Sequence, residues 1–228
     1  MQVVDKELFH IHRKNHHQDL WKPGNILETP KDEFNHFYKG LSTEPHRKVS
    51  KDFEQFELID YLNKNIDELE KFNNSIDNQE LNQNNVSNIQ GFNSHIFNLL
   101  KQTFHSLAQS RKMLREIIFE DCRTKYFFEL PSRQKCFWLS DKEQIEKWWT
   151  EFNDNENKLI CKVSVTGNLF HADGSFIQMD IFKFTDFNEL ANKYWHGQIN
   201  SNSDLIQKEI IFEGKLKILS KYDNPSEL

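Results

Sequence analysis

The apolar residues of this chain change their spacing along the sequence, and this change constrains the fold more than any other feature. Residues 52–72 and 94–127 carry apolar side chains at helical spacing. From Leu159 to Thr166 apolar and polar residues alternate instead, which predicts a half-buried strand that ends at Gly167. Because strand patterns lie at both ends and helical patterns lie between them, the sequence predicts an α+β domain.

Shorter patterns supply the remaining expected elements. Pro131 should end the second helix, whose apolar stripe contains Leu107, Leu114, Ile117, Ile118 and Cys122, with Arg111, Arg115, Glu116 and Arg123 largely off it. The Asn-rich tract over residues 73–93 predicts either a linker or a weakly signalled helix. The other expected elements are a strand around Leu8, an extended piece at Asn25–Leu27 after a Pro23-Gly24 turn, a strand at Cys136–Ser140, helices at Asp141–Phe152 and Asp186–Trp195, a hairpin-like turn at Asp173-Gly174, and strands at Ile210–Glu213 and Lys215–Leu219 around a kink at Gly214.

Composition limits the classes of protein that fit. The 228 residues suit one domain with insertions, and 20 Phe and 5 Trp supply bulk for a core. A net charge of −6 argues against nucleic-acid binding through overall electrostatic attraction alone. Three widely spaced cysteines predict free thiols in a reducing cytosol. The sequence shows no secretory signal and no membrane-spanning run, so a cytoplasmic protein without membrane contact is expected.

Three short motifs occur in a suggestive order. They are Leu8-Phe9-His10, then Phe137-Trp138-Leu139-Ser140, then Gln207-Lys208-Glu209 directly before an apolar strand. Together they resemble the catalytic frame of His-Tyr-Glu ADP-ribosyltransferases, a superfamily that includes DNA-modifying toxins, rifamycin-modifying transferases and RNA 2′-phosphotransferases. The resemblance covers roughly residues 6–30 and 115–219. It implies a single domain over residues 1–228 with a split mixed or antiparallel β-sheet core, and a helical, Asn-rich insertion at residues 31–110.

The resemblance assigns roles to these residues. Glu209 would stabilise the positive charge that develops on the ribose when NAD is split, Gln207 would orient the acceptor, and His10 would bind a ribose hydroxyl. Apart from the resemblance, the chemistry of this reaction favours an acidic residue. A fixed carboxylate contributes most to transition-state stabilisation where the transition state is positively charged. Phe137, Trp138 and Ser140 would line the nicotinamide pocket.

Several assignments stay open at this stage. Glu213 shares the strand parity of Glu209, and His12 shares the parity of His10, so either member of each pair could face the cleft. Arg13 would meet the NAD pyrophosphate or be a surface charge. The histidines at positions 10, 12, 16 and 17 invite a metal interpretation, but no acid or Cys follows at ligand spacing, so no metal is expected. The Tyr194-Trp195-His196-Gly197 segment would present a substrate-contact surface or pack a helix end.

The expected function is therefore an NAD-dependent mono-ADP-ribosyltransferase of a bacterial toxin–antitoxin or antiviral defence type. NAD would be a substrate, nucleic acid (RNA or DNA) the favoured acceptor, and a neutralising antitoxin protein the partner. One alternative is an NAD glycohydrolase or RNA 2′-phosphotransferase on the same fold. Another is a non-catalytic interaction protein in which the helices of residues 52–72 and 94–127 bind a partner and the strands are scaffold.

Overall fold

The computed structural model describes residues 1–14, 19–43, 48–51, 54–57, 66–68, 70–71, 86–152, 157–177, 184–200 and 208–228. The chain divides into two compact units. Met1–His36 and Arg115–Leu228 form the first, called here the curled-sheet unit, and Phe37–Leu114 form the second, the helical unit. These bounds lie close to those of the insertion expected at residues 31–110.

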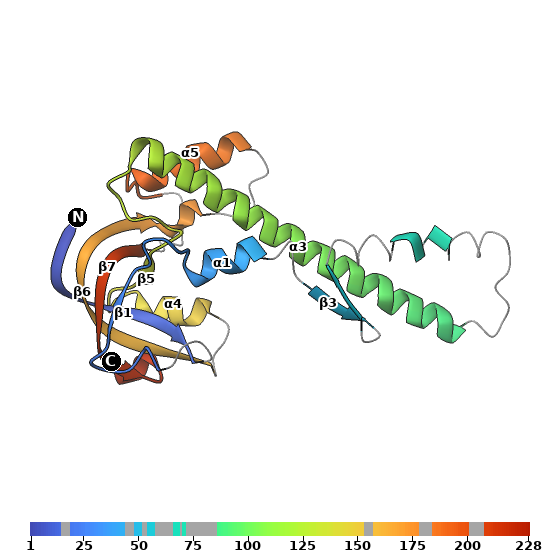
Figure 1. Cartoon of the computed structure of the whole chain (residues 1–228), viewed down its shortest axis with the longest axis horizontal. Helices are drawn as coiled ribbons and strands as arrows, with labels where there is room; N and C mark the ends of the chain where they lie inside the picture. The colour runs from blue at the N-terminus through green and yellow to red at the C-terminus, as the bar shows by residue number, and fades with distance from the viewer. Residues whose placement is uncertain are drawn as a thin grey trace. The chain divides into compact units, whose positions relative to one another are not determined.

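An antiparallel sheet forms the frame of the curled-sheet unit (Figure 1). Its strands run in the order β1-β6-β7-β2, and β5 also pairs with β7. Every pairing among them is antiparallel. The α+β class predicted from the change in apolar spacing is therefore confirmed. The strand bounds are β1 Gln2–Arg13, β2 Ile26–Glu28, β5 Phe137–Leu139, β6 Lys158–Asp173 and β7 Lys208–Tyr222.

The two longest strands bend together at a pair of glycines. Gly167 of β6 lies opposite Gly214 of β7, with φ angles of +155° and +145° that L side chains rarely adopt. A Cβ on Gly167 would lie 2.3 Å from the Glu213 carbonyl oxygen, and one on Gly214 would lie 2.6 Å from that of Thr166. Both strands continue through the bend, so the expectations of a strand end at Gly167 and of two separate strands around Gly214 are wrong. Glycine kinks a strand here without ending its ladder.

The inner face of this curled sheet packs on itself. Residues from both halves of β6 and β7 form one apolar cluster with Leu8 of β1 and with Trp21, and none of its members among the described residues comes from a helix. Its members alternate along each strand with residues of the opposite face, as the two-residue period of a strand requires. The buried residues of this cluster are Leu8, Trp21, Leu139, Leu159, Cys161, Val163, Val165, Leu169, Ile210, Phe212, Leu216 and Ile218.

Helices cover the outer face of the sheet. The C-terminal part of α3 (Val86–Tyr126), α5 (Phe184–Trp195) and the short 3₁₀ helix η3 (Gly174–Phe176) pack over Ala172 and Ile211. Helix α4 (Ile145–Glu151) places Ile145 against Phe9 and Ile160 at the other end. η3 lies where a hairpin-like turn was expected at Asp173-Gly174, because the Asp173 carboxylate accepts a hydrogen bond from Ser175 N and caps a helical turn. The chain ends in a second 3₁₀ helix, η4 (Pro225–Glu227).

The helical unit contains α1 (His36–Thr43), a two-stranded ladder of β3 (Lys48–Lys51) and β4 (Glu54–Glu57), and α3 as far as Leu114. The helix expected over residues 52–72 is wrong at β4, where Glu54–Glu57 pair with β3 in an antiparallel ladder. Helical structure is present at residues 66–68 and 70–71, and the rest of that expectation lies outside the described residues. α3 begins at Val86, so the last part of the Asn-rich tract is helix.

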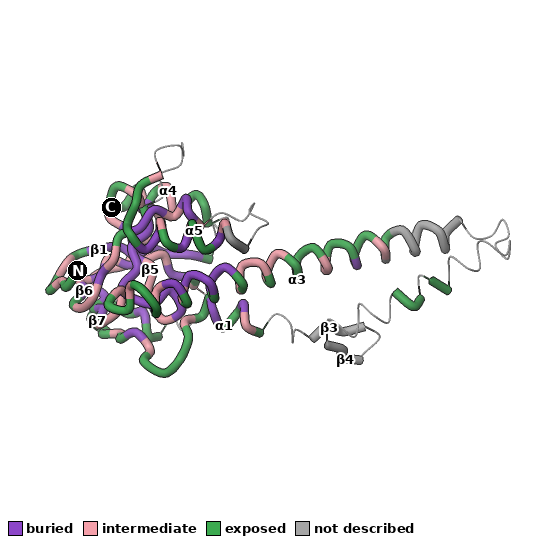
Figure 2. The backbone as a smooth tube through the Cα atoms, turned by 90° about the horizontal axis from the view of Figure 1, so that it is seen from above, coloured by how far each residue is buried: buried purple, intermediate pink, exposed green. Residues whose placement is uncertain are grey.

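Burial differs along the chain (Figure 2). In the curled-sheet unit the buried residues concentrate in β6, in the first half of β7 and in α3 from Arg115 to Cys122, whereas the described α3 residues of the helical unit are mostly exposed or intermediate. None of the described helices combines the length and apolar character that crossing a bilayer requires.

Candidate functional site

A closed network of charged side chains surrounds Glu209. The carboxylate, at the start of β7, accepts hydrogen bonds at one oxygen, Oε2, from Arg133 Nη1 and from Tyr194 Oη, the latter at 2.5 Å. Arg133 Nη1 also donates to Tyr194 Oη at 2.7 Å, and Arg133 Nε donates to Glu116 Oε2 at 2.9 Å. Arg115 Nη2 completes the network by donating to Glu116 Oε1 at 2.7 Å. Two guanidinium groups therefore balance two carboxylates.

All five side chains of this network are buried. Burial by itself raises the pKa of Glu116, but Arg133 and Arg115 outweigh it, so the pKa of Glu116 is lowered overall. Burial lowers the pKa of Arg133, and the two carboxylates reverse this and raise it well above its ordinary value. Burial also raises the pKa of the Tyr194 phenol well above its usual range. Glu116 is thus ionised, Arg133 is protonated and Tyr194 is neutral.

A second group of side chains surrounds His10 on the inner face. The imidazoles of His10 and His12 both stack on the indole of Trp21, with ring centroids 4.4 and 4.6 Å away. Phe137 approaches His10 edge-on at 6.3 Å. His10 Nδ1 lies 2.8 Å from the carbonyl oxygen of Trp138, and because a carbonyl only accepts, Nδ1 carries the proton.

Burial of the His10 imidazole lowers its pKa to about 4, while its hydrogen bond to the Trp138 carbonyl acts in the opposite direction. His10 is therefore neutral near pH 7, with its Nε2 lone pair available as an acceptor. A neutral imidazole with an acceptor nitrogen is suited to bind a hydroxyl group.

The predicted catalytic pair does not meet in one cleft. His10 lies opposite Cys161 of the inner cluster, whereas Glu209 lies opposite Ala172 on the outer face. The alternation of side chains along a strand places the two groups on opposite sides of the sheet. Gln207 lies outside the described residues. The catalytic roles of Glu209, Gln207 and His10 stay predictions.

The expected nicotinamide pocket is brought together only in part. Ser140 exchanges backbone hydrogen bonds with Phe9 at 2.8 and 2.9 Å, which joins the end of β5 to β1 beside His10. Phe137 shares the inner face with His10, but Trp138 lies opposite Ile211 on the outer face, and its carbonyl oxygen accepts the hydrogen bond from His10 Nδ1.

The remaining predicted site residues are spread over the unit. Arg13 is exposed at the end of β1, on the strand face opposite to His10. Glu213 is partly exposed and lies opposite Asn168. Arg123 pairs with Glu120 at 2.8 Å and donates to the Leu130 carbonyl, which fixes the end of α3.

For the Tyr194-Trp195-His196-Gly197 segment, substrate contact and helix-end packing were both open, and the structure places its two aromatic residues in the core. Tyr194 and Trp195 are buried, and the Trp195 indole donates to the Phe119 carbonyl at 2.8 Å. The alternative of helix-end packing is therefore confirmed for these two aromatic residues. The end of α5 turns at Gly197, whose φ of +65° favours glycine.

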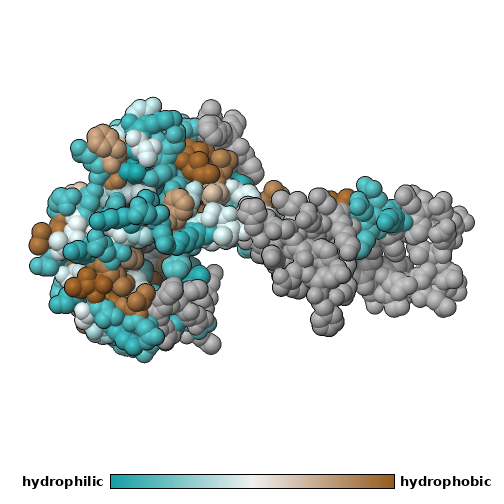
Figure 3. All heavy atoms as spheres, in the orientation of Figure 1, coloured by the Kyte–Doolittle hydropathy of each residue, from teal (hydrophilic) through white to brown (hydrophobic). Residues whose placement is uncertain are grey.

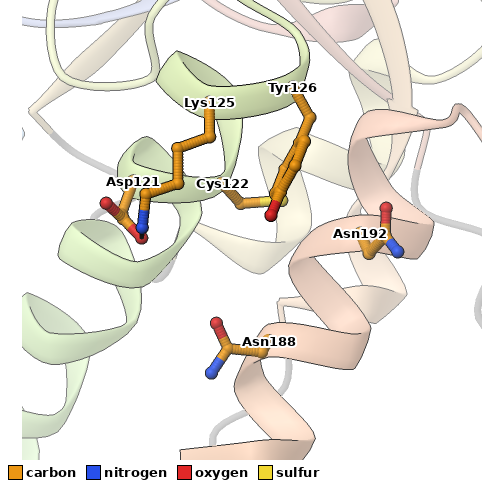
Figure 4. A pocket seen from close by; sticks show the side chains of 6 residues that line it. All are labelled: Asp121, Cys122, Lys125, Tyr126, Asn188 and Asn192. Atoms are coloured by element: carbon orange, nitrogen blue, oxygen red, sulfur yellow. Dashed lines mark hydrogen bonds and ion pairs between the residues drawn. The ribbon is translucent and has the colours of Figure 1, made fainter.

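Among the described residues, neither the surface hollows nor the possible metal ligands form another candidate site. The His, Cys, Asp and Glu side chains placed there form no group of three that would hold a metal, and His16 and His17 lie outside the described ranges. A hollow between α3 and α5 is lined by polar groups and one thiol (Figure 4). In it Lys125 Nζ pairs with Asp121 at 2.7 Å, so its one cation is already neutralised. The lining residues are Asp121, Cys122, Lys125, Tyr126, Asn188 and Asn192.

The apolar stripe of α3 differs in the structure from the stripe that the helical pattern predicted. The apolar stripe predicted on α3 splits in the structure, because Ile118 and Cys122 are buried whereas Leu107 and Leu114 are exposed. The exposed residues continue toward the N-terminus of the helix at three- and four-residue spacing. The exposed fractions are 67% for Phe97, 64% for Leu100, 75% for Phe104, 61% for Leu107 and 42% for Leu114.

These features define a class: an α+β protein with a curled antiparallel sheet, a closed ionic network behind it, and a long helix with an exposed apolar stripe. The chain belongs to the family described as "Protein of unknown function (DUF2441)", whose model matches residues 8–224. No curated protein matches the chain.

Proposed function

We propose that this protein is a helix-docking protein, in which the exposed stripe of α3 binds an amphipathic α-helix and the curled-sheet unit is its scaffold. One observation carries the proposal: five large apolar side chains between Phe97 and Leu114 are exposed on one side of a regular helix. Single exposed apolar residues are ordinary, whereas a contiguous row of them marks an interaction site.

The spacing of this row identifies the kind of partner. Phe97, Leu100, Phe104, Leu107 and Leu114 occupy alternating a and d positions of a heptad pattern, with Arg111 at the remaining a position. Such a three- and four-residue spacing matches the seam of a coiled coil, where side chains of one helix enter the holes of another. The stripe is thus shaped for a helix.

The other exposed apolar residues in the part of the chain that the structure describes do not form such a row. On the face drawn in Figure 3, the curled-sheet unit is mostly hydrophilic, with separate apolar patches between polar side chains. Exposed apolar residues of that unit such as Ile26, Phe128 and Phe152 come from a strand and from connecting segments.

A binding experiment with a designed helix tests this proposal. The probe is a fluorescent peptide of about four heptads with Leu and Ile at the a and d positions, compared with a peptide of the same composition in scrambled order. Wild-type protein should bind the heptad peptide, and Leu107→Glu should weaken binding by at least about tenfold, since a charge enters the apolar seam. Asn98→Glu, which adds the same charge at an exposed position outside the stripe, is the control. Equal binding of both peptides, or binding of neither by the monomeric protein, would contradict the proposal.

A second candidate is the NAD-dependent mono-ADP-ribosyltransferase of toxin type, with nucleic acid as acceptor and an antitoxin as partner. A specific observation favours it: His10, Phe137 and Ser140, which the resemblance places around NAD, lie on neighbouring strands at one end of the sheet. The neutral His10 imidazole has the acceptor nitrogen that a ribose hydroxyl requires.

In this second candidate the carboxylate of Glu209 would have to stabilise the ribosyl cation. Arg133 and Tyr194 engage Glu209 on the outer face, whereas His10 lies on the inner face, so both the network and this part of the sheet have to rearrange before the carboxylate meets a ribose bound at His10. Incubation with labelled NAD and cell extract, followed by nuclease or protease, tests it. Label retained on nucleic acid supports transfer, and free ADP-ribose alone supports an NAD glycohydrolase. No loss of NAD in wild type, with His10→Gln and Glu209→Gln the same, would contradict both.

A further inference from the structure

We propose that the helix bound by the α3 stripe is α3 of a second copy of this chain, in antiparallel orientation, with the two-fold axis between Phe104 and Leu107. This inference rests on the proposed helix-docking function and names its partner. A two-fold dimer requires a surface that complements itself.

The stripe meets this requirement through its spacing. From Phe97 to Leu114 the steps between seam positions alternate as three, four, three, four and three residues, which is the same in both directions. Two antiparallel copies therefore align with every a position beside a d position of the partner. The layers then place Phe97 beside the partner's Leu114, Leu100 beside its Arg111 and Phe104 beside its Leu107.

The charged residues favour the antiparallel arrangement over the parallel one. In a parallel pair, Arg111 would meet its own symmetry mate in the seam, and two like charges at close range repel. In the antiparallel pair Arg111 lies beside an apolar leucine, along which its aliphatic stem can pack. Of the flanking positions, Lys101 then lies opposite Ala108 and Thr103 opposite Ser110, so no like charges face each other there.

The apolar area of the stripe is sufficient for a specific interface. A fully buried aromatic side chain removes roughly 150–250 Å² from water, so Phe97 and Phe104 together would bury about 300 Å² that is now exposed. Three partly exposed leucines add a comparable area. Two copies then bury about 1,200 Å² in total, above the roughly 1,000 Å² that a specific interface should exceed.

Sedimentation equilibrium and spin labelling of the full chain test this inference together. Wild type and Asn98→Glu should sediment as dimers, and Leu107→Glu as a monomer with unchanged circular dichroism. Spin labels are then placed singly at Asn98, His105 and Lys112, which share one heptad position and differ only in their place along the helix.

The antiparallel register predicts a particular distance profile between the paired labels. With a rise of 1.5 Å per residue, the two labels of a dimer should be offset along the axis by about 22 Å at Asn98, about 2 Å at His105 and about 20 Å at Lys112. The distance should therefore be shortest at His105, whereas a parallel pair would give equal distances at all three positions and would overturn the register.

The outcomes separate this inference from the proposed function. A monomeric wild type at all concentrations overturns the second copy as partner. If that monomer still binds the heptad peptide and Leu107→Glu does not, the helix-docking function stands and its partner is another chain. If the monomer binds neither peptide, both proposals fail.

Discussion

The Tyr194 hydroxyl donates a 2.5 Å hydrogen bond to Glu209 Oε2, and this bond lies on the face of the sheet opposite to His10. The acid that the sequence singles out is therefore held by a tyrosine and an arginine behind the sheet. This arrangement matters first for stability. Removing one partner from a buried ion pair leaves an uncompensated buried charge, which destabilises the fold.

Glu209→Gln should destabilise the protein by about 3 kcal/mol, since it leaves the positive charge of Arg133 balanced by Glu116 alone in a buried site. Urea unfolding followed by circular dichroism measures the change in the free energy of unfolding. Glu213→Gln, on the same strand at a partly exposed position, is the matched control and should change stability by less than about 0.5 kcal/mol. Equal effects of the two substitutions would show that the network contributes nothing.

Gly214→Ala should destabilise the protein by at least about 2 kcal/mol, because its φ of +145° disfavours a side chain and a Cβ would meet the Thr166 carbonyl at 2.6 Å. Gly40→Ala is the opposite case. No atom lies within 4 Å of a Cβ at that helical position, so alanine should stabilise by roughly 0.5–1 kcal/mol. Thermal unfolding of both variants measures the contrast, and a neutral Gly214→Ala would refute the strained bend.

His10 should make stability depend on pH. Burial lowers its pKa to about 4 in the folded state, whereas the unfolded value is near 6.5, so the unfolded chain binds the proton more readily. The stability associated with neutral His10 is fully present above about pH 6.5 and is lost as the pH falls toward 4. This contribution is roughly 1–3 kcal/mol, allowing for partial exposure of the ring. Urea unfolding between pH 7 and pH 4.5 should show a shallower loss for His10→Gln, and identical slopes would contradict the assignment.

The three cysteines should react slowly with thiol reagents in the folded protein. All are buried, and burial raises the pKa of Cys161 to about 12 and that of Cys136 well above its ordinary value. Because the thiolate is the reactive form, modification should be at least about 100-fold slower than in urea. A colorimetric thiol assay measures both rates, and equally fast labelling of the native protein would indicate an open core.

The sequence predicted the elements that depend on local pattern. Alternation over Leu159–Thr166 marked β6, and helical spacing marked α3 and α5, because these periods are set by the geometry of each element. The kink at Gly214 was predicted, but the same bend at Gly167 was mistaken for a strand end, and β7 was divided into two strands. A lone glycine has the same local signature in a kink as at a terminus, and only pairing across the two strands distinguishes them.

The site was harder to predict because it depends on faces and on distant partners. The alternation of side chains fixes which neighbours in the same strand share a face with His10 or with Glu209. Whether these two faces lie on the same side of the sheet is decided by the pairing of β1 and β7 with β6. Arg115 and Glu116 were expected off the apolar stripe of α3, yet both are buried. Their opposite charges, together with those of Arg133 and Glu209, allow this, and no local pattern reveals such a pairing.

The most direct test of the account is hydroxyl-radical footprinting of the wild-type protein, read by mass spectrometry at Phe104, with Phe128 as an internal reference. The two rings are 75% and 72% exposed in the single chain, so an unoccupied stripe would oxidise both at similar rates. If a helix covers the seam, Phe104 should be protected from oxidation at least about fivefold relative to Phe128. This protection is expected at high protein concentration or with the heptad peptide. The account also predicts that Leu107→Glu removes this protection. Equal oxidation of the two rings under every condition would contradict the helix-docking function.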